Sequence, residues 1–225
     1  TPLILRPDLL MTENGFTLSE MDAVPGGVGL TAFLNELYES ADPGVEVVGS
    51  MRSMLDAFYD ALAESVSERS FPFIAILVSD EAATYRPEME WIASHLQRMG
   101  KRVFVFHPDD VMPLGNSLCV AMEGDPQKID IVYRFWELFD SDNIGSLDHI
   151  LDIWDEGEVL VTPPMRPFQE EKMSLGLFHH TLLQPYWKEN LSKSEYRLLH
   201  RIIPKTWIMD PAPVPPCAVL DAPYV

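Results

Sequence analysis

Four charged residues near the N-terminus are spaced so that they could act together. Arg6 and Asp8 alternate along one β-type segment, and Glu20 and Asp22 alternate along the next. Because successive side chains of a strand point to opposite faces, the two members of each pair share a face. If the two segments pair, their three carboxylates lie close together and repel one another unless a cation lies between them. Oxygen ligands of this kind suit Mg²⁺. The spacing therefore predicts a Mg²⁺ site, with Arg6 able to reach a phosphoryl oxygen.

The same residues fit a second interpretation, a solvent-exposed hairpin face with a cross-strand ion pair. The hairpin itself is predicted by Glu13-Asn14-Gly15, since Asn-Gly between two β-type segments is a strong turn signal. Closure of the turn at Asn14-Gly15 would set Asp8 opposite Met21 and beside Glu20 and Asp22. Both interpretations require this pairing, so the sequence leaves them open.

A glycine-rich turn follows the second segment and precedes a helix. It contains Pro25, Gly26, Gly27 and Gly29. Backbone N–H groups in such a turn can approach an anion, and the helix start adds a partial positive charge. We predict a phosphate or substrate loop here, although a plain turn with a helix start explains the same residues equally well.

A βαβ unit is predicted in the middle of the chain. Residues 73–78 form a continuous apolar run typical of a strand buried on both faces, residues 87–99 an amphipathic helix, and residues 101–107 a second strand. A parallel, Rossmann-like layer binds ligands beyond the carboxyl ends of its strands. The candidate substrate-binding residues there are Ser79, Asp80, Glu81 and Arg86. Polar residues also collect in such loops for structural reasons.

The remaining pattern completes an α/β chain. Further helices are predicted around residues 30–37, 50–66, 146–155, 170–183 and 193–202, and further strands at 129–135 and 158–162. We expect four segments: 1–66 with the hairpin and two helices, 67–128 with the Rossmann-like layer, 129–210 with the later strands and helices, and 211–225 as a proline-rich linker.

Composition narrows the classes of partner. Lys and Arg number 16 against 35 Asp and Glu, a formal charge of −19, which disfavours nucleic acid and anionic membranes. ATP is compatible with this charge, because Mg²⁺ reverses the local field. No apolar run of about 18 residues suggests a membrane span. Only two cysteines occur, Cys119 and Cys217, so a cytoplasmic location is expected.

The order Arg6-x-Asp8, a turn, Glu20-x-Asp22 and then Pro-Gly-Gly resembles the metal-binding hairpin of the glutathionylspermidine synthase-like, circularly permuted ATP-grasp family. That family carries Glu-x-Asn twelve residues after the Asp, a spacing that Asp8 and Glu20 keep. Asp22 stands where the family usually has Asn. Its carboxylate still offers an oxygen to Mg²⁺ while adding charge.

Two later segments resemble the same family. Residues 129–137 are similar to a strand of the form Ile-Asp-x-x-x-Lys-x-x-x-Glu, with Arg134 at the basic position. Residues 159–175 are similar to a strand, loop and helix that opens with a lysine, here Lys172. The resemblance implies that Arg134 and Lys172 contact nucleotide phosphates. Without it, Arg134 is expected in a surface ion pair and Lys172 beside the neighbouring glutamates.

The resemblance implies a partial ATP-grasp-like fold with an inserted Rossmann-like, pre-ATP-grasp layer. It implies an ATP- and Mg²⁺-dependent carboxylate–amine ligase that acts through an acyl phosphate. In it Asp8, Glu20 and Asp22 would hold the metal, Arg6 would be catalytic, and the partners would be small-molecule acids and amines. We expect the chain to be a fragment that is inactive alone. A non-catalytic scaffold or small-ligand module is the alternative, favoured by Asp22 and Arg134.

Overall fold

The computed structural model describes residues 2–42, 44, 46–66 and 71–206. Its contacts divide the chain into two compact units, each described by itself below. The first unit comprises Thr1–Ile4 and Val24–Met165, and the second comprises Leu5–Ala23 and Arg166–Val225.

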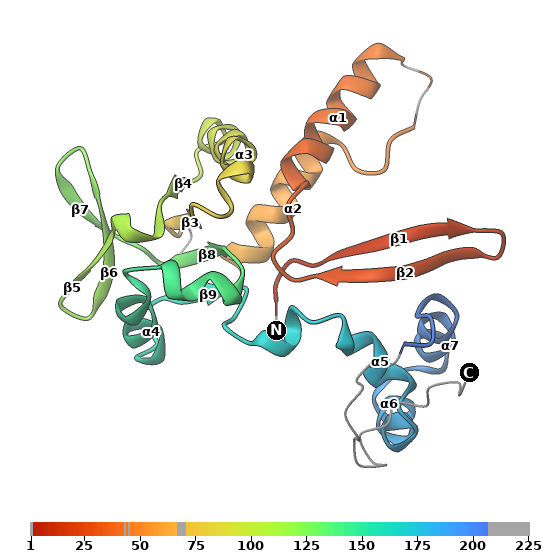
Figure 1. The fold of residues 1–225 in the computed structure, drawn as a ribbon. Coiled ribbons are helices and arrows are strands. Elements are labelled where there is room, and N and C mark those ends of the chain that lie inside the picture. Colours follow the sequence, from red (N-terminus) through yellow and green to blue (C-terminus); the bar gives the residue numbers. More distant parts are fainter. Residues whose placement is uncertain (1, 43, 45, 67–70, 207–225) are drawn as a thin grey trace. The chain divides into compact units, whose positions relative to one another are not determined.

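A four-stranded parallel sheet forms the centre of the first unit (Figure 1). Its strand order is β4-β3-β8-β9, and every neighbouring pair is parallel. The strands are β3 (Ile74–Val78), β4 (Val103–Phe106), β8 (Ile131–Phe135) and β9 (Leu160–Thr162). Each was predicted as a strand, and β3 is buried at every position, as its continuous apolar run requires.

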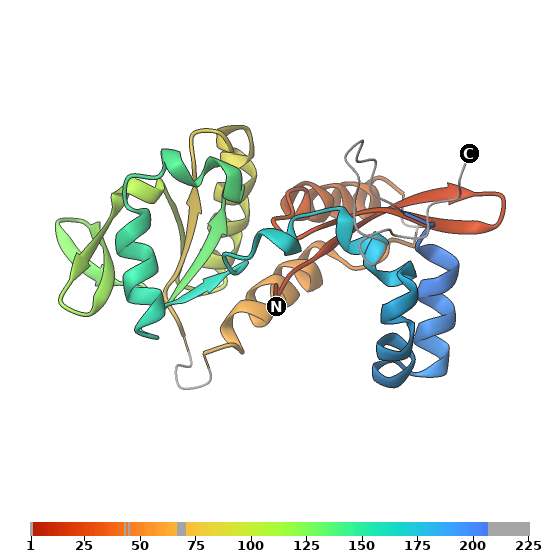
Figure 2. The same ribbon diagram turned by 60° about the horizontal axis from the view of Figure 1, so that its bottom comes forward.

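Both faces of this sheet are covered, so the unit has two apolar layers. Ile74, Ile76 and Val78 of β3 pack with helices α2 and α3, while Ala75 and Leu77 pack with α4 and a small antiparallel sheet (Figure 2). The helices of this unit are α1 (Val28–Ala41), α2 (Met51–Ala63), α3 (Arg86–Arg98) and α4 (Leu147–Asp155). The alternation of partners along β3 follows from the two-residue period of a strand.

The small antiparallel sheet was not predicted from the sequence. Its order is β5-β6-β7, with β5 (Val111–Leu114), β6 (Ser117–Met122) and β7 (Asp125–Lys128). Glu123 and Gly124 join β6 to β7 with φ values of 52° and 94°. Two consecutive positive φ values are typical of tight hairpin turns, and the strands between such turns are too short to show a clear period.

The second unit combines the N-terminal hairpin with three C-terminal helices. These elements are β1 (Arg6–Thr12), β2 (Gly15–Asp22), α5 (Met173–His179), α6 (Gln184–Asn190) and α7 (Lys193–Ile202). Leu18 of β2, Leu175 and Phe178 of α5, and Ile203 form its small buried core. Ser192 and Glu195 cap α7 reciprocally, with N–H···O distances of 3.2 and 2.8 Å, which fixes where that helix begins.

The chain is thus a mixed α/β protein with parallel and antiparallel sheets, which confirms the predicted α/β class. The division into units differs from the predicted segments, because β8 pairs with β3 and β9 pairs with β8, so residues 129–165 belong with the first unit. The predicted linker, 211–225, lies outside the described residues. Among the described helices, none is long and apolar enough to cross a membrane.

Candidate functional site

The charged residues of the hairpin come together in the second unit. Nε of Arg6 lies 3.0 Å from Oδ1 of Asp8, and its terminal nitrogen lies 3.1 Å from Oδ2 of Asp22. The three side chains are between 23% and 42% exposed, so solvent screens the pairs only in part. One guanidinium is therefore shared by two carboxylates.

Their meeting follows from the strand register, which differs by one residue from the prediction. Arg6 pairs with Asp22, Pro7 with Met21 and Asp8 with Glu20, whereas the predicted closure set Asp8 opposite Met21. The turn residues are Glu13 and Asn14, and a bulge at Ser19 shifts the register again, with the Ser19 hydroxyl donating to the Asp8 carbonyl at 3.0 Å. Directly paired residues share a face, so the pair of Asp8 with Glu20 lies two positions along the hairpin from the pair of Arg6 with Asp22.

Lys172 joins the same group from the beginning of α5. Its Nζ lies 3.1 Å from Oε2 of Glu20. The glutamates beside Lys172 in the sequence were the alternative partners, and the ion pair instead reaches across the unit to β2. Hereafter Arg6, Asp8, Glu20, Asp22 and Lys172 are called the hairpin cluster, which holds three acidic and two basic side chains.

The hairpin cluster has the donor chemistry of a Mg²⁺ site without its geometry. Carboxylate oxygens suit a hard divalent cation. In the described part of the chain, however, no three His, Cys, Asp or Glu side chains lie close enough to hold one metal ion. The carboxylates face Arg6 and Lys172 instead.

Arg134 of β8 occupies a different environment from the one expected. It is 0% exposed, so the surface ion pair predicted without the family resemblance is wrong. Its Nε donates to the Pro163 carbonyl at 3.2 Å, another guanidinium nitrogen donates to the Trp136 carbonyl, and the guanidinium lies 5.6 Å from the Trp136 ring. This arrangement ties the loops after β8 and β9 together. Asp130 is the acidic residue of the same family-like segment, 129–137, and its side chain accepts from the Phe73 backbone N–H at 2.8 Å.

The predicted glycine loop packs against the region of α3. A Cβ on Gly26 would lie 2.4 Å from the Tyr85 ring, and one on Gly29 would lie 2.8 Å from Cγ of Glu88. Gly27 precedes α1 with a φ of 88°, a left-handed conformation that favours glycine. Close packing and a helix start therefore account for these glycines in this structure, and Pro25, beside them, is buried.

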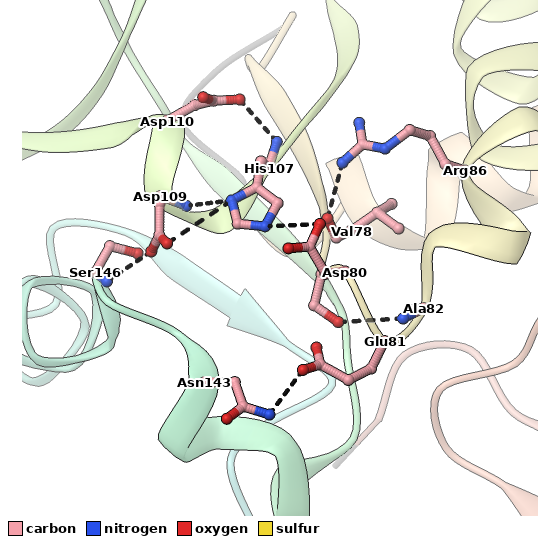
Figure 3. Close-up of polar contacts among 11 residues, drawn as sticks. Val78, Asp80, Glu81, Ala82, Arg86, His107, Asp109, Asp110, Asn143 and Ser146 are labelled. Carbon is pink, nitrogen blue, oxygen red and sulfur yellow. Dashed lines mark hydrogen bonds and ion pairs between the residues drawn. The ribbon is translucent and has the colours of Figure 1, made fainter.

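A second polar group lies at the carboxyl ends of β3 and β4 (Figure 3). The Arg86 guanidinium donates to the Val78 carbonyl at 2.9 Å, and the Ser79 hydroxyl accepts from the Ala82 backbone N–H at 3.3 Å. Asn143 donates from its side-chain amide to Oε1 of Glu81 at 2.7 Å. All four candidate residues predicted here, Ser79 to Glu81 and Arg86, lie at this sheet edge.

His107 also belongs to this strand-end group, because it follows β4 at the carboxyl end of a predicted strand. Nδ1 of His107 accepts from the Asp109 backbone N–H at 3.2 Å, and its Nε2 lies 3.5 Å from Oδ1 of Asp80. Asp109 in turn accepts from the Ser146 backbone N–H at 2.9 Å. Histidine immediately after a parallel strand was the available signal, and its partner Asp80 is distant in the sequence.

The electrostatics of the strand-end group distinguish two carboxyls. Hydrogen bonds from its own backbone N–H and from Ser79 lower the pKa of Glu81, with Asn143 and the charge of His107 adding to the effect. Burial raises the pKa of Asp140, and the charge of Glu81 raises it further. The group thus offers carboxylate acceptors and one histidine. β3 is followed by β4 on one side of it, whereas β8 is followed by β9 on the opposite side, so the carboxyl ends of these strands are the expected ligand position of an open sheet.

A scan of the chain against models of protein families found no match, and a search of curated proteins found none either.

Proposed function

We propose that this chain is part of an ATP-dependent carboxylate–amine ligase. The hairpin cluster is the observation that supports the proposal best. Arg6 and three carboxylates gather on one hairpin, at the spacing by which the sequence resembles the circularly permuted ATP-grasp family, and Lys172 reaches them from the beginning of α5. Arg6 and Lys172 have the charge and reach to contact phosphoryl oxygens, and Asp8, Glu20 and Asp22 are the proposed Mg²⁺ ligands.

In the proposed reaction the γ-phosphoryl group of ATP passes to an oxygen of the acid substrate, which releases ADP and leaves an acyl phosphate. The amine then attacks the carbonyl carbon, the carbon–oxygen bond to phosphate breaks, and the amine loses a proton as the amide forms. The protein's part in such chemistry is mainly positioning and charge stabilisation. ATP and Mg²⁺ are the proposed cofactors, small-molecule acids and amines the substrates, and the cytoplasm the compartment.

The state described here is compatible with a change of partners on nucleotide binding. Arg6 and Lys172 now neutralise carboxylates that would otherwise repel one another. A bound magnesium nucleotide would offer phosphate oxygens to Arg6 and Lys172 and a divalent ion to Asp8, Glu20 and Asp22. Nucleotide binding would then replace the present ion pairs with new ones, so no charged side chain of the cluster would be left without a partner.

The test is nucleotide titration by calorimetry, with and without Mg²⁺, on the full chain and on Asp8→Asn, Glu20→Gln and Arg6→Gln. We expect Mg²⁺-dependent binding that each substitution weakens by about tenfold or more, since a charged contact contributes about 1.5–3 kcal/mol. Glu13→Gln in the hairpin turn makes the same chemical change outside the cluster and should leave binding unaltered. Unchanged binding in the first three variants contradicts the proposed site.

A non-catalytic ligand-binding protein of the same architecture is the second candidate, and the burial of Arg134 favours it. A guanidinium that donates to two main-chain carbonyls in the interior is engaged in holding loops together. Nucleotide binding without ATP consumption in the intact protein, supplied with candidate acids and amines, would select this alternative.

A further inference from the structure

A cavity of about 310 Å³ opens between α1 and α3 in the first unit. It is lined by Gly29, Leu30, Phe33, Pro87, Glu88 and Trp91. Ligand pockets in proteins start at about 300 Å³. At about 30 Å³ per water-sized group, this one has room for roughly ten non-hydrogen atoms.

At Gly29, which lines the cavity, α1 lies too close to α3 for a side chain. A Cβ at this position would lie 2.8 Å from Cγ of Glu88 and 2.9 Å from Cγ1 of Ile92. Without it, α1 approaches α3 closely enough for the Gly29 backbone N–H to donate to Oε1 of Glu88 at 2.9 Å. The Glu88 carboxylate is thereby held at the cavity wall.

The rest of the lining is apolar and incompletely covered. Leu30 is 55% exposed and Phe33 45% exposed, large fractions for such side chains. The rings of Phe33 and Trp91 meet edge to face, with centroids 6.3 Å apart, and the His95 ring lies 4.0 Å from the Trp91 ring. The indole is thus fixed beside open apolar surface.

Glu88 lacks a cationic partner in the part of the chain that the structure describes. A carboxylate has about four acceptor positions, and the recorded contact of Glu88 is the one from Gly29. Aromatic rings attract cations to their faces, and a chain of charge −19 concentrates cations around it. A half-buried acid beside two aromatic rings is therefore complementary to a positive charge.

We propose that this cavity binds a small amphiphilic cation, an ammonium group attached to a short apolar chain or single ring. The ammonium would donate to Glu88, and the apolar part would cover Leu30, Phe33 and Trp91. The inference rests on the geometry of α1 and α3 alone and does not depend on the proposed ligase function.

The experiment is calorimetric titration of the full chain with hexylammonium chloride and with 1-hexanol, its neutral counterpart, at constant ionic strength. We expect hexylammonium to bind at least about fivefold more tightly than hexanol, because a cation near an aromatic face contributes about 1 kcal/mol and a charged hydrogen bond more. Amide nitrogen NMR of Gly29 and the Trp91 indole N–H should report the same titration.

Glu88→Gln tests the site without removing the acceptor for the Gly29 N–H, and it should weaken hexylammonium binding about tenfold while hexanol binding stays the same. Glu90→Gln is the matched control, because Glu90 is exposed on the same helix and outside the cavity lining. Equal affinities for the two probes, an equal loss in Glu90→Gln, or no hexylammonium binding at millimolar concentration would each overturn the proposal. Thermal unfolding of both variants checks that they are folded.

Discussion

Arg134 illustrates how burial changes the meaning of a charged residue. The sequence indicates only a basic position on a strand, whereas the structure encloses the guanidinium among main-chain carbonyls after β8 and β9. Removing one partner of a buried charged hydrogen bond is costly, because the groups left behind lose their donors and cannot reach water.

We therefore expect Arg134→Met to lower the free energy of unfolding by about 3 kcal/mol, measured by urea denaturation. Arg134→Lys should recover part of the loss, because one nitrogen can still donate. Arg52→Met is the control, since Arg52 is 74% exposed and pairs with Asp56 within one helix; it should change stability by less than about 0.5 kcal/mol. A Met variant as stable as the native protein would show that the buried contacts contribute nothing.

Glu81 and Asp140 predict opposite responses to pH. The pKa of Glu81 is lowered, chiefly by a backbone hydrogen bond, so its stabilising contribution is present above the ordinary value of 4.5 and is lost as the pH falls through the folded-state value. The pKa of Asp140 is raised, chiefly by burial, so its contribution is present below 3.8 and is lost as the pH rises.

Melting temperatures measured between about pH 3 and pH 7 should separate the two. Glu81→Gln should flatten the gain in stability as the pH rises through the acid range, and Asp140→Asn should raise the melting temperature near neutrality relative to the native protein. Parallel curves for native protein and Glu81→Gln would contradict the assigned contacts.

Among the helices and strands, those whose residues show a clear local pattern could be predicted from the sequence, whereas strand register and contacts between distant loops could not. The continuous apolar run of β3 is typical of a buried strand and the amphipathic pattern of α3 is typical of a helix, and both elements were predicted. Near the turn the predicted register of β1 with β2 was off by two residues, because the turn closes at Glu13-Asn14, and the bulge at Ser19 reduces the difference to one. The contact between Glu81 and Asn143 joins loops 62 positions apart, and no periodicity encodes it.

The packing of α1 on α3 predicts a specific cost for adding one methyl group. Gly29→Ala gains helix propensity of about 1 kcal/mol, but its Cβ would lie 2.8 Å from Cγ of Glu88 and 2.9 Å from Cγ1 of the fully buried Ile92. Overpacking costs about 1–3 kcal/mol, so we expect net destabilisation of about 1 kcal/mol in thermal or urea unfolding.

Ile92→Ala provides the internal control for this packing contact. Although destabilising alone, it removes atoms that the new methyl would meet, so Gly29→Ala should cost less in that background than in the native one. Equal costs in the two backgrounds would place the effect elsewhere than in the helix contact.

At the scale of the whole molecule, the two compact units have separate apolar cores of different size. The first unit buries both faces of its sheet, whereas the buried core of the second consists of Leu18, Leu175, Phe178 and Ile203. A small core supplies little hydrophobic stabilisation. The second unit, which carries the hairpin cluster, is therefore expected to open more readily than the first.

Phe178 is the residue on which this difference can be tested. Its ring lies within 6.0 Å, centroid to centroid, of the rings of His179, Trp187, Tyr196 and His200. Phe178→Ala should cost about 3–5 kcal/mol in the second unit. Amide hydrogen exchange should then speed up in α7 and in β2, while the amides of β3 and β8 keep their native protection. Equal acceleration in both units would show that they unfold as one cooperative whole, and the hairpin cluster would then share the stability of the central sheet.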